Sequence, residues 1–594
     1  MPGTRQAPQQ FVDSADGVRI AVYEEGNLDG PTVVLVHGWP DSHVLWDRVV
    51  PLLAERFRII RYDNRGVGLS SAPKPVSAYT MARYADDFAA VIGELSPGRP
   101  VHVLAHDWGS VGVWEYLGRP GAADRVASFT SVSGPAQDQL VNWMFAGLRR
   151  PWRPRLFARA VSQALRLSYM ALFSIPVLTP LILRLVFSRA AVRRVLVDNI
   201  PADQVCHSEN MASDAADSIK VYPANYWRSY SGKFRRQGVR VVDVPVQLVV
   251  NTNDKFVRPW GYDATARWVP RLWRRDIRAG HWSPMSHPQV LAAAVHDLAD
   301  LDEGKAPSRA LLRAQVGRPR GYFGDTLVSV TGAGSGIGRE TALAFAKEGA
   351  ELVISDIDEA TVKETAAMIA ARGGVAHPYV LDVSDAEAVE AFAEEVSNEH
   401  GIPDIVVNNA GIGQAGNFLD TPASEFERVM DVNFGGVVNG SRSFARRLVE
   451  RGTGGHIVNV ASMAAYAPLQ SLNAYCTSKA ATFMFSDCLR AELDAAGVGL
   501  TTICPGVIDT NIVSTTRFAV PTGKGEEQVD DRRGQLNKMF ALRHYGPDKV
   551  ADAIVSAVKK NKPIRPVAPE AYALYGISRV LPQALRSTAR MRVI

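Results

Sequence analysis

Hydrophobic and polar positions in the first half of the chain follow the rhythm of a parallel α/β sheet, with helical stretches between short apolar runs. The runs lie at residues 32–36, 58–62, 101–105, 126–132, 245–250 and 273–277. Buried parallel strands read as continuous apolar runs because helices cover both faces of their sheet. We therefore predict a first α/β domain over residues 1–301.

Other segments depart from this rhythm. Residues 136–240 form a helical, aromatic and arginine-rich insertion. The segment 302–325 is polar, contains proline and glycine, and has no apolar period long enough for a core element, so we predict a linker there. Strand and helix alternation resumes over 326–568 and predicts a second α/β domain. The last residues, 569–594, are expected to form a basic amphipathic tail.

The composition fits a folded soluble chain with two cores. The chain has 594 residues, of which 46% are hydrophobic and 21% charged, and about 250 to 300 residues per unit is enough for a large core. The first ten residues, MPGTRQAPQQ, lack the apolar stretch of a signal peptide, so we expect the protein to be cytoplasmic. The four cysteines form no CxxC pair, so we predict neither disulfides nor a metal site.

The distribution of charge says more than the net charge of +5. No helix-turn-helix, zinc-finger or RNA-binding motif accompanies it, so we expect no nucleic acid partner. Ten arginines lie between Asn142 and Ile200 against one acid, Asp198, and the tail carries arginines 579, 586, 590 and 592. Apolar residues between them suit a surface that contacts an anionic membrane or a long acyl substrate, although a solvated basic face is equally compatible.

The uncharged run from Ser168 to Leu183 is not expected to span a membrane. It is shorter than the roughly 20 residues that a spanning helix needs. Pro176 and Pro180 also interrupt it.

Residues 105–109 read AHDWG, a nucleophile-elbow pattern with Asp107 in the place of the nucleophile. A carboxylate attacks a saturated carbon and becomes part of an alkyl-enzyme ester, so its substrates are epoxides or alkyl halides. Water must then attack that ester, and we expect the backbone N–H groups of Trp39 and Trp108 to form the oxyanion hole. His281 follows the last strand and would activate the water, while Asp254 would orient the imidazole.

The strings HGWPDS, YDNRGVGLS, AHDWGS and AGHWSPM resemble the epoxide-hydrolase branch of the α/β-hydrolase family. The resemblance implies an α/β-hydrolase fold with a helical cap at about 136–240 and two cap tyrosines that protonate the opening epoxide. Tyr169 matches the first tyrosine. The second position holds Trp227, and we assign the role to its neighbour Tyr226. Tyr222, Tyr226 and Tyr230 share a helix face, so a packing stripe is the alternative.

Haloalkane dehalogenases share the aspartate nucleophile and the adjacent tryptophan, so Trp108 does not separate the two activities. Tyr169 favours an epoxide, because a departing halide needs no proton.

The string TGAGSGIG at 331–338 follows a strand and precedes a helix, an arrangement that offers backbone N–H groups to a pyrophosphate. Asp356 ends the next strand, where it would accept both ribose hydroxyls and repel a 2′-phosphate. This predicts NAD in preference to NADP. Arg339, a base close to the glycines, keeps NADP as the less favoured alternative.

A set of four residues, Asn433, Ser462, Tyr475 and Lys479, resembles the catalytic set of the short-chain dehydrogenase/reductase superfamily over about residues 322–568. Tyr475 and Lys479 lie one helical turn apart, so we expect the ammonium to lower the pKa of the phenol. Ser462 would hold the substrate oxygen, and Asn433 would order a water that relays protons to Lys479. The resemblance also implies a Rossmann fold and a homo-oligomer. The expected cofactor-binding residues are Gly332, Ser335, Gly336, Ile337, Gly338, Asp356, Asp382, Val383, Asn409, Ala410, Gly411, Tyr475, Lys479, Pro505, Gly506 and Thr510.

The two halves together predict a bifunctional enzyme and resemble mycobacterial proteins that join an epoxide hydrolase to a short-chain dehydrogenase. This makes a long-chain lipid epoxide the leading substrate class. Hydrolysis would give a vicinal diol, and the second site would interconvert a secondary alcohol and a ketone. Our hypothesis is that the two sites act one after the other on one substrate. A hydrolase half that has lost catalysis and serves as a binding module is the alternative.

Overall fold

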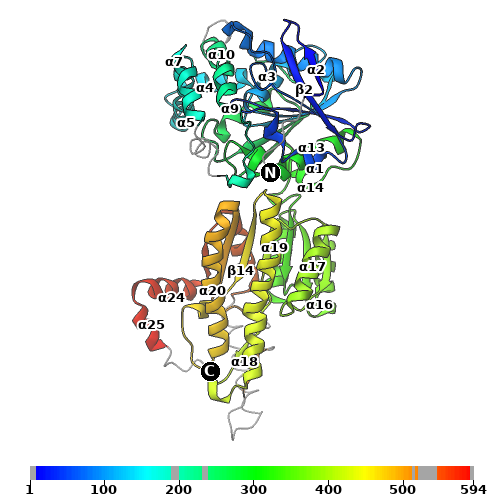
Figure 1. The fold of residues 1–594 in the computed structure, drawn as a ribbon. Helices are drawn as coiled ribbons and strands as arrows, with labels where there is room; N and C mark the ends of the chain where they lie inside the picture. The colour runs from blue at the N-terminus through cyan, green and yellow to red at the C-terminus, as the bar shows by residue number, and fades with distance from the viewer. Residues whose placement is uncertain (1–7, 189–199, 230–238, 511–515, 520–544, 589–594) are drawn as a thin grey trace. The chain divides into compact units, whose positions relative to one another are not determined.

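The computed structural model describes residues 8–188, 200–229, 239–510, 516–519 and 545–588. The chain divides into two compact units between Arg318 and Pro319. Each unit is an α/β structure built on a mainly parallel sheet (Figure 1), as the sequence predicted.

In the described residues the first unit contains an eight-stranded sheet with the order β1-β2-β4-β3-β5-β6-β7-β8. Its strands are β1 (Gln10–Asp13), β2 (Arg19–Gly26), β3 (Thr32–Val36), β4 (Arg58–Tyr62), β5 (Val101–His106), β6 (Val126–Val132), β7 (Val246–Asn251) and β8 (Leu272–Ile277). Strands β3 to β8 are parallel and confirm the six expected runs. Strands β1 and β2 were not predicted. They form an antiparallel hairpin. Exposed residues lie at the ends of both strands, so neither strand gives the continuous apolar run by which the other six were recognised.

Helices cover both faces of this sheet. They include α2 (Met81–Leu95), α3 (Asp107–Leu117) and α13 (Pro288–Asp302). Val34 of β3 packs in one cluster with Phe88 of α2, whereas Leu35 packs in the other with Leu291 of α13. Successive side chains of a strand point to opposite faces, so every residue of β3 is buried. This double burial fixes the ends of the strands, where the candidate residues lie.

The predicted insertion forms a helical cap between β6 and β7, and its helices lie together on one side of the unit (Figure 1). They include α4 (Gln137–Leu148), α5 (Pro154–Arg166), α6 (Tyr169–Phe173), α7 (Leu178–Phe187), α9 (Met211–Ser218) and α10 (Val221–Ser229). In the described part of the chain, no single helix is long and apolar enough to cross a membrane. The segment Pro154–Phe173 and α7 meet that criterion only as a pair bent by 100°.

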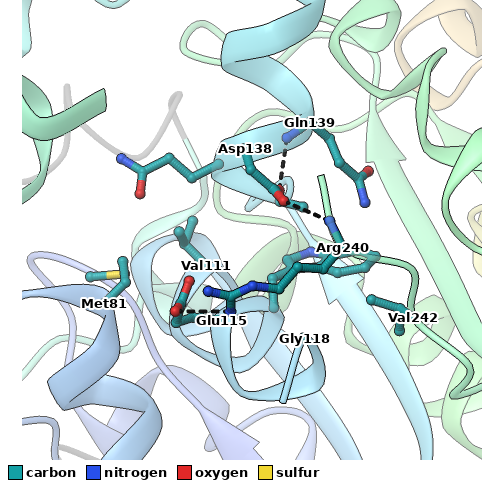
Figure 2. Close-up of a pocket in the computed structure, with 11 residues that line it drawn as sticks. Met81, Val111, Glu115, Gly118, Asp138, Gln139, Arg240 and Val242 are labelled. Atoms are coloured by element: carbon teal, nitrogen blue, oxygen red, sulfur yellow. Dashed lines mark hydrogen bonds and ion pairs between the residues drawn. The ribbon is translucent and has the colours of Figure 1, made fainter. Parts of the chain in front are cut away.

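The two ends of the cap meet beside a polar pocket of about 410 Å³ (Figure 2). The Asp138 carboxylate accepts hydrogen bonds from the N–H groups of Gln139 at 2.8 Å and Arg240 at 3.3 Å. The Arg240 guanidinium donates to Glu115 of α3 at 3.1 Å. Arg240 therefore ties both ends of the cap to the helix that begins at Asp107.

The expected linker over 302–325 is structured in part. It contains α14 (Arg309–Ala314), which begins at the side-chain cap of Ser308. Leu311 is fully buried against Trp273 and Leu298 of the first unit. The polar composition concealed this helix because its buried face consists of little more than one turn.

In the described residues the second unit has a seven-stranded parallel sheet with the order β11-β10-β9-β12-β14-β15-β17. The strands are β9 (Leu327–Thr331), β10 (Glu351–Asp356), β11 (Ala376–Val380), β12 (Ile405–Asn408), β14 (Gly455–Val460), β15 (Val498–Pro505) and β17 (Ile564–Val567). The helices around it include α15 (Gly336–Lys347), α16 (Glu359–Ala370), α17 (Ala386–Glu399), α19 (Gly436–Arg451), α20 (Asn473–Leu493) and α23 (Pro547–Lys559). The strand order reverses between β9 and β12, and ligands of doubly wound folds bind outside the carboxyl ends of strands at such a point.

The predicted tail begins with two helices, α24 (Pro569–Val580) and α25 (Pro582–Thr588). The Tyr466 hydroxyl donates to the carbonyl of Ala571 at 2.9 Å, and Glu570 accepts the N–H of Val507. The start of the tail is therefore part of the second unit. Arg590 and Arg592 lie outside the described residues.

Candidate active sites

Asp107 occupies a strained turn between β5 and α3. Its φ is 46°, in the left-handed region that side-chain-bearing residues rarely adopt. The turn leaves the carboxylate at the carboxyl end of the sheet, on the wall of a pocket. This is the geometry that the AHDWG pattern predicted.

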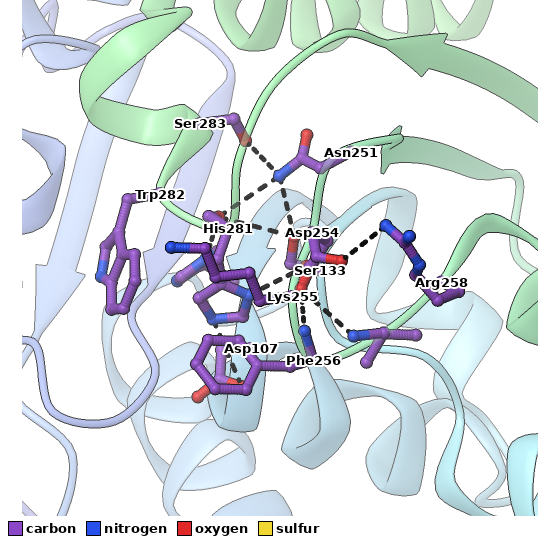
Figure 3. Close-up of polar contacts among 12 residues, drawn as sticks. Asp107, Ser133, Asn251, Asp254, Lys255, Phe256, Arg258, His281, Trp282 and Ser283 are labelled. Carbon is purple, nitrogen blue, oxygen red and sulfur yellow. Dashed lines mark hydrogen bonds and ion pairs between the residues drawn. The ribbon is translucent and has the colours of Figure 1, made fainter. Parts of the chain in front are cut away.

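The structure brings His281 and Asp254 to the same carboxylate (Figure 3). His281 Nδ1 lies 2.9 Å from Asp254 Oδ2, and His281 Nε2 lies 3.8 Å from Asp107 Oδ1. The other oxygen of Asp254 accepts the N–H groups of Phe256 at 2.7 Å and Val257 at 3.1 Å. The three predicted residues thus form a chain from a fixed acid through an imidazole to the nucleophile.

Charge coupling sets the pKa values of this chain. Burial raises the pKa of Asp107 to about 6, although His281 and two backbone N–H groups oppose it. Burial by itself lowers the pKa of His281, but the charges of Asp254 and Asp107 and the Asp254 hydrogen bond raise it to about 9. Burial likewise raises the pKa of Asp254, but His281 and the two N–H groups hold it below its ordinary value. At neutral pH the two carboxylates therefore flank an imidazolium.

Residues that the sequence reasoning missed hold the backbone of His281. Its carbonyl accepts His106 Nε2 at 3.0 Å and Asn251 Nδ2 at 3.3 Å. Asn251 also donates to Ser133 Oγ at 2.8 Å and Ser283 Oγ at 3.0 Å (Figure 3). Asn251 and Ser133 lie at the ends of β7 and β6, and strand-end position was the signal that could have indicated them.

The expected oxyanion-hole donors lie at the nucleophile. Trp39 N–H donates to Asp107 Oδ2 at 3.0 Å, and the Trp108 N–H bonds to the same carboxylate. Both indole N–H groups have other partners. Trp39 Nε1 donates to the carbonyl of Ala215 at 3.0 Å, and the Trp108 side chain hydrogen-bonds to Tyr222.

An apolar pocket of about 670 Å³, counted with its open mouth, lies between Asp107 and the cap. Tyr169 and Tyr226 both line it. The hydroxyl that bonds to Tyr169 nevertheless belongs to Tyr222, whose ring centroid lies 5.9 Å from that of Tyr169. Burial and the charge of Asp107 raise the pKa of Tyr169, and burial, Tyr169 and Asp107 raise that of Tyr222. The geometry thus favours Tyr222 over the predicted Tyr226 as the partner of Tyr169. Tyr230, the third tyrosine of the stripe, lies outside the described residues.

In the second unit the glycine loop joins β9 to α15. Gly332 has a φ of 64°, and a Cβ on Gly338 would lie 2.0 Å from the carbonyl oxygen of Gly332. Ser335 precedes the helix and makes no side-chain cap bond, so its side chain leaves the first-turn N–H groups, including those of Ile337 and Gly338, available to a ligand. A pyrophosphate fits this helix start.

Asp356 ends β10 as predicted and accepts the N–H of Gly334 at 2.8 Å. The guanidinium of Arg339 is engaged elsewhere. It donates to Glu364 at 2.6 Å, to Thr365 at 3.1 Å and to the carbonyl of Gly334. Arg339 is therefore paired with a carboxylate on α16, and the negative charge of Asp356 stays beside the glycine loop.

The remaining cofactor-site candidates are held around the same strand ends. Asn409 donates to the carbonyls of Thr331 and Gly332, and the Ala410 N–H donates to Thr331 Oγ1. Asp382 fixes its own turn through Ser384, and the Val383 carbonyl accepts from Asn439. Two further contacts complete the set. The Gly506 N–H bonds to Val567 after Pro505, and a Cβ on Gly336 would lie 3.6 Å from Thr510.

Two of the four catalytic candidates of this unit, Asn433 and Lys479, lie beside Gly411. Asn433, in a π-helical turn over Asp431–Gly435, accepts the N–H of Ile412 at 2.8 Å and donates to Ser478 at 3.2 Å. Lys479 Nζ donates to the carbonyl of Val460 at 3.0 Å. Ser462 hydrogen-bonds to Tyr475, and Lys479 Nζ lies 5.9 Å from the Tyr475 ring centroid.

The expected lowering of the Tyr475 pKa is not what these contacts give. Burial raises that pKa, and the bond to Ser462 only opposes the rise. Burial also lowers the pKa of Lys479 to about 8. The prediction was wrong because it counted the attraction between ammonium and phenolate and left out the desolvation of both groups.

Three side chains at the edge of the second sheet, Glu351, His377 and His400, lie close enough to be considered as metal ligands. The rings of His377 and His400 stack with centroids 3.9 Å apart and an interplanar angle of 21°. A metal must lie near the plane of each ring that binds it, so two stacked rings do not converge on one ion. We assign no metal here.

Comparison with known proteins identifies both units. Residues 31–288 match the alpha/beta hydrolase fold and residues 326–519 match the short chain dehydrogenase family. Over 594 residues, 100% of each chain, the sequence is 80% identical to "Probable oxidoreductase EphD" of Mycobacterium tuberculosis and of Mycobacterium bovis. The chain belongs to the EphD family. It is thus a two-domain enzyme with oxidoreductase activity.

The dehydrogenase unit of this EphD-family chain also has smaller relatives. It is 30% identical over 242 residues to the C alpha-dehydrogenase of Sphingobium sp., a match that covers 40% of this chain and 79% of that protein. A crystal structure of a short-chain dehydrogenase/reductase from Burkholderia phymatum in complex with NAD is 28% identical, with a TM-score of 0.40, over 43% of this chain and 94% of that chain.

The pKa of His281 in this EphD-family protein should depend on Asp254. We expect the imidazole to titrate near pH 9 and the pKa to fall by about 1 to 3 units in Asp254→Asn, because the neutral amide no longer stabilises the imidazolium. Nitrogen NMR of selectively labelled histidine measures this titration. Asp263→Asn, which removes an exposed carboxylate bound to Arg274, is the control and should change nothing. An unchanged His281 pKa in Asp254→Asn would contradict the charge coupling.

Proposed function

We propose that the hydrolase unit converts a long-chain lipid epoxide into a vicinal diol through an alkyl-enzyme ester on Asp107. The main support is the chain Asp254–His281–Asp107 at the wall of an apolar pocket. His281 lies 2.9 Å from the carboxylate of Asp254 and 3.8 Å from that of Asp107. The pKa of Asp107 of about 6 leaves it ionised at neutral pH, as a nucleophile requires.

In the first step a carboxylate oxygen of Asp107 bonds to one carbon of the epoxide ring, and that carbon's bond to the ring oxygen breaks. The oxygen leaves as an alkoxide and takes a proton from a cap tyrosine. Tyr169 and Tyr222 suit this role because burial keeps both phenols protonated and they bond to one another. Tyr226 also lines the pocket and would contact the substrate chain.

In the second step water hydrolyses the ester. Alkylation removes the negative charge of Asp107, one of the causes of the high His281 pKa, so the imidazolium releases its proton to solvent more readily and the neutral imidazole is then available to take a proton from the water. The resulting oxyanion forms on the Asp107 side chain, where the N–H groups of Trp39 and Trp108 stabilise it. Breaking the ester bond releases the diol.

The two alternatives from the sequence are less well supported. A haloalkane dehalogenase needs indole N–H donors for the halide, but both tryptophans at this site already donate to protein oxygens. An inactive binding module would have no need of the acid, imidazole and oxyanion-hole geometry, all of which is intact.

We propose further that the dehydrogenase unit uses NAD and interconverts a secondary alcohol and a ketone. Asp356 disfavours a 2′-phosphate, and Arg339 is committed to Glu364. When bound, NAD would supply the acceptor for the hydride of the alcohol carbon. Ser462 orients the hydroxyl, Tyr475 takes its proton, and Lys479, whose pKa is about 8, can pass a proton on near neutral pH. A diol from the first site is a suitable alcohol, so the sites could act in sequence.

Isotope labelling in a single turnover tests whether the ester forms on Asp107, because it shows whether oxygen from water enters the protein or the diol. With enzyme in excess over a long-chain epoxide in H₂¹⁸O, the diol receives its new oxygen from Asp107, and the heavy oxygen enters the protein. We expect a mass increase of about 2 Da in the peptide that contains Asp107, and no diol from Asp107→Ala. Direct attack by water would instead label the diol, and that result would contradict the proposal.

The same assay separates the two tyrosines. Tyr222→Phe should slow alkylation by roughly 100-fold because a proton donor is lost. Tyr226→Phe is the matched control and should leave that rate nearly unchanged. The reverse order of effects would return the role to Tyr226.

Tyr475→Phe should abolish NAD-dependent oxidation of the diol by removing the proton acceptor, while NAD still binds, because the glycine loop and Asp356 are untouched. NADH absorbance measures turnover, and calorimetry measures binding. Tyr466→Phe, a change to a phenol that bonds to Ala571 instead, serves as the control. Turnover in Tyr475→Phe would refute the assigned role.

We infer from the family resemblance that this unit pairs with a second copy through α19 and α20. These helices carry exposed Val449 and Met484. Light scattering should therefore give at least twice the mass of one chain, and a monomer at micromolar concentration would contradict the inference.

A further inference from the structure

Helix α7 is apolar on two opposite faces. Its inner face buries Leu183 and Phe187, which join the aromatic cluster of the cap. Its outer side, which we call the apolar face, consists of Val177, Leu178, Leu181, Ile182 and Leu185, between 48% and 74% exposed. A helix with two apolar faces is normally buried on both, yet no residue that the structure describes covers the apolar face.

The turn before α7 keeps this face outward. The Leu178 N–H bonds to the carbonyl of Pro176 at 2.7 Å, closing a tight turn around Val177. Val177 has a φ of 66°, which is strained for a β-branched residue, and it is 74% exposed. A strained turn that presents an apolar side chain to the outside points to a function for that exposure.

Positive charge accompanies the apolar face. Residues 139–188 contain seven arginines and no aspartate or glutamate. Four of them, at 149, 150, 153 and 155, are exposed between the end of α4 and the first turn of α5 and have no ion pair with a described residue. Apolar side chains and unpaired arginines on the same cap match the acyl region and the anionic headgroups of a lipid surface.

The inner side of the same helix reaches the hydrolase site. Phe187 packs on Trp39 with ring centroids 6.0 Å apart, and the Trp39 N–H holds Asp107. The neighbouring segment α5–α6 lines the Asp107 pocket with Leu167 and Met170. One short cap segment therefore carries both the apolar face and part of the pocket wall.

We propose that the apolar face docks on an anionic lipid bilayer, and that the cap draws its epoxide substrate from this surface. The docking stands on the exposed face and the arginines alone. The delivery of substrate rests on the proposed function. A bilayer fits better than a second copy of the chain, because the four arginines without an ion pair to a described residue would repel their own copies in a symmetric contact.

Cosedimentation with large vesicles tests the docking. Full-length protein should sediment with vesicles of phosphatidylcholine and 30% phosphatidylglycerol, about tenfold more weakly at high than at low salt. The double variant Leu181→Ser, Leu185→Ser should bind at least about tenfold more weakly, because it lacks two leucines that the bilayer would bury. Leu28→Ser, Leu69→Ser removes two leucines of similar exposure outside the cap and should bind like the wild type. Circular dichroism checks that both variants fold.

Each other outcome overturns the docking. Equal binding by the wild type and the Leu181→Ser, Leu185→Ser variant would exclude the apolar face. Loss of binding in Val580→Ser, Leu581→Ser instead would assign the contact to the tail. A dimer that forms in solution and is lost in the Leu181 and Leu185 variant would make the face a contact between copies.

Activity separates this proposal from the proposed function. The Leu181 and Leu185 variant should lose hydrolysis of a long-chain epoxide held in vesicles but keep hydrolysis of a short, water-soluble epoxide. Equal loss on both substrates would contradict delivery from the bilayer. Vesicle binding by a protein that opens neither epoxide would refute the hydrolysis and leave the docking intact.

Discussion

The hydrolase site depends on one imidazole shared by two carboxylates. Without the His281 charge, a second buried carboxylate beside Asp254 would be costly and would take up a proton. With it, Asp107 stays ionised at neutral pH despite its burial. The remaining features serve this arrangement. The hydrogen bonds of Phe256 and Val257 fix the acid, Asn251 fixes the backbone of the base, and the strained turn fixes the nucleophile.

The coupling also orders the proposed steps in time. While Asp107 is charged, its partner is an imidazolium that cannot act as a base. Once Asp107 becomes an ester, its negative charge is gone and the pKa of His281 falls. The imidazolium then releases its proton, and the neutral imidazole can act as the base. The dehydrogenase site works differently. Burial raises the pKa of Tyr475 and lowers that of Lys479 to about 8, so in the protein alone Tyr475 stays a neutral phenol while Lys479 is still mostly protonated at pH 7. The positive charge of oxidised NAD is the kind of partner that would shift Tyr475 toward its phenolate.

The sequence predicted those parts that depend on local pattern. Asp107, His281 and Asp254 follow strands in a fixed order, and the glycine loop, Asp356 and the Tyr475 to Lys479 spacing are equally local. It failed where a partner is distant in the chain. The sequence favoured Tyr226 and gave no signal for the bond between Tyr169 and Tyr222, because only the folded cap shows which hydroxyl meets Tyr169. Helix α14 was taken for linker because Leu311 is buried by Trp273, a residue of another element. The direction of the Tyr475 pKa was missed because desolvation is a property of the fold.

The cap links the site to the proposed lipid surface through packed side chains. Interiors are close-packed, so a displaced helix moves its neighbours rather than sliding over a void. Phe187 of α7 contacts Trp39, and Trp39 supplies both an N–H to Asp107 and an indole N–H to Ala215 beside α9. A shift of α7 on a bilayer would therefore act on the oxyanion hole as well as on the pocket mouth. The two ends of the cap cannot shift in this way. Arg240 at one end bonds to Asp138 at the other end and to Glu115 of α3. This combination of a fixed root and an uncovered outer helix is what a cap needs if it is to respond to a surface without detaching from the nucleophile.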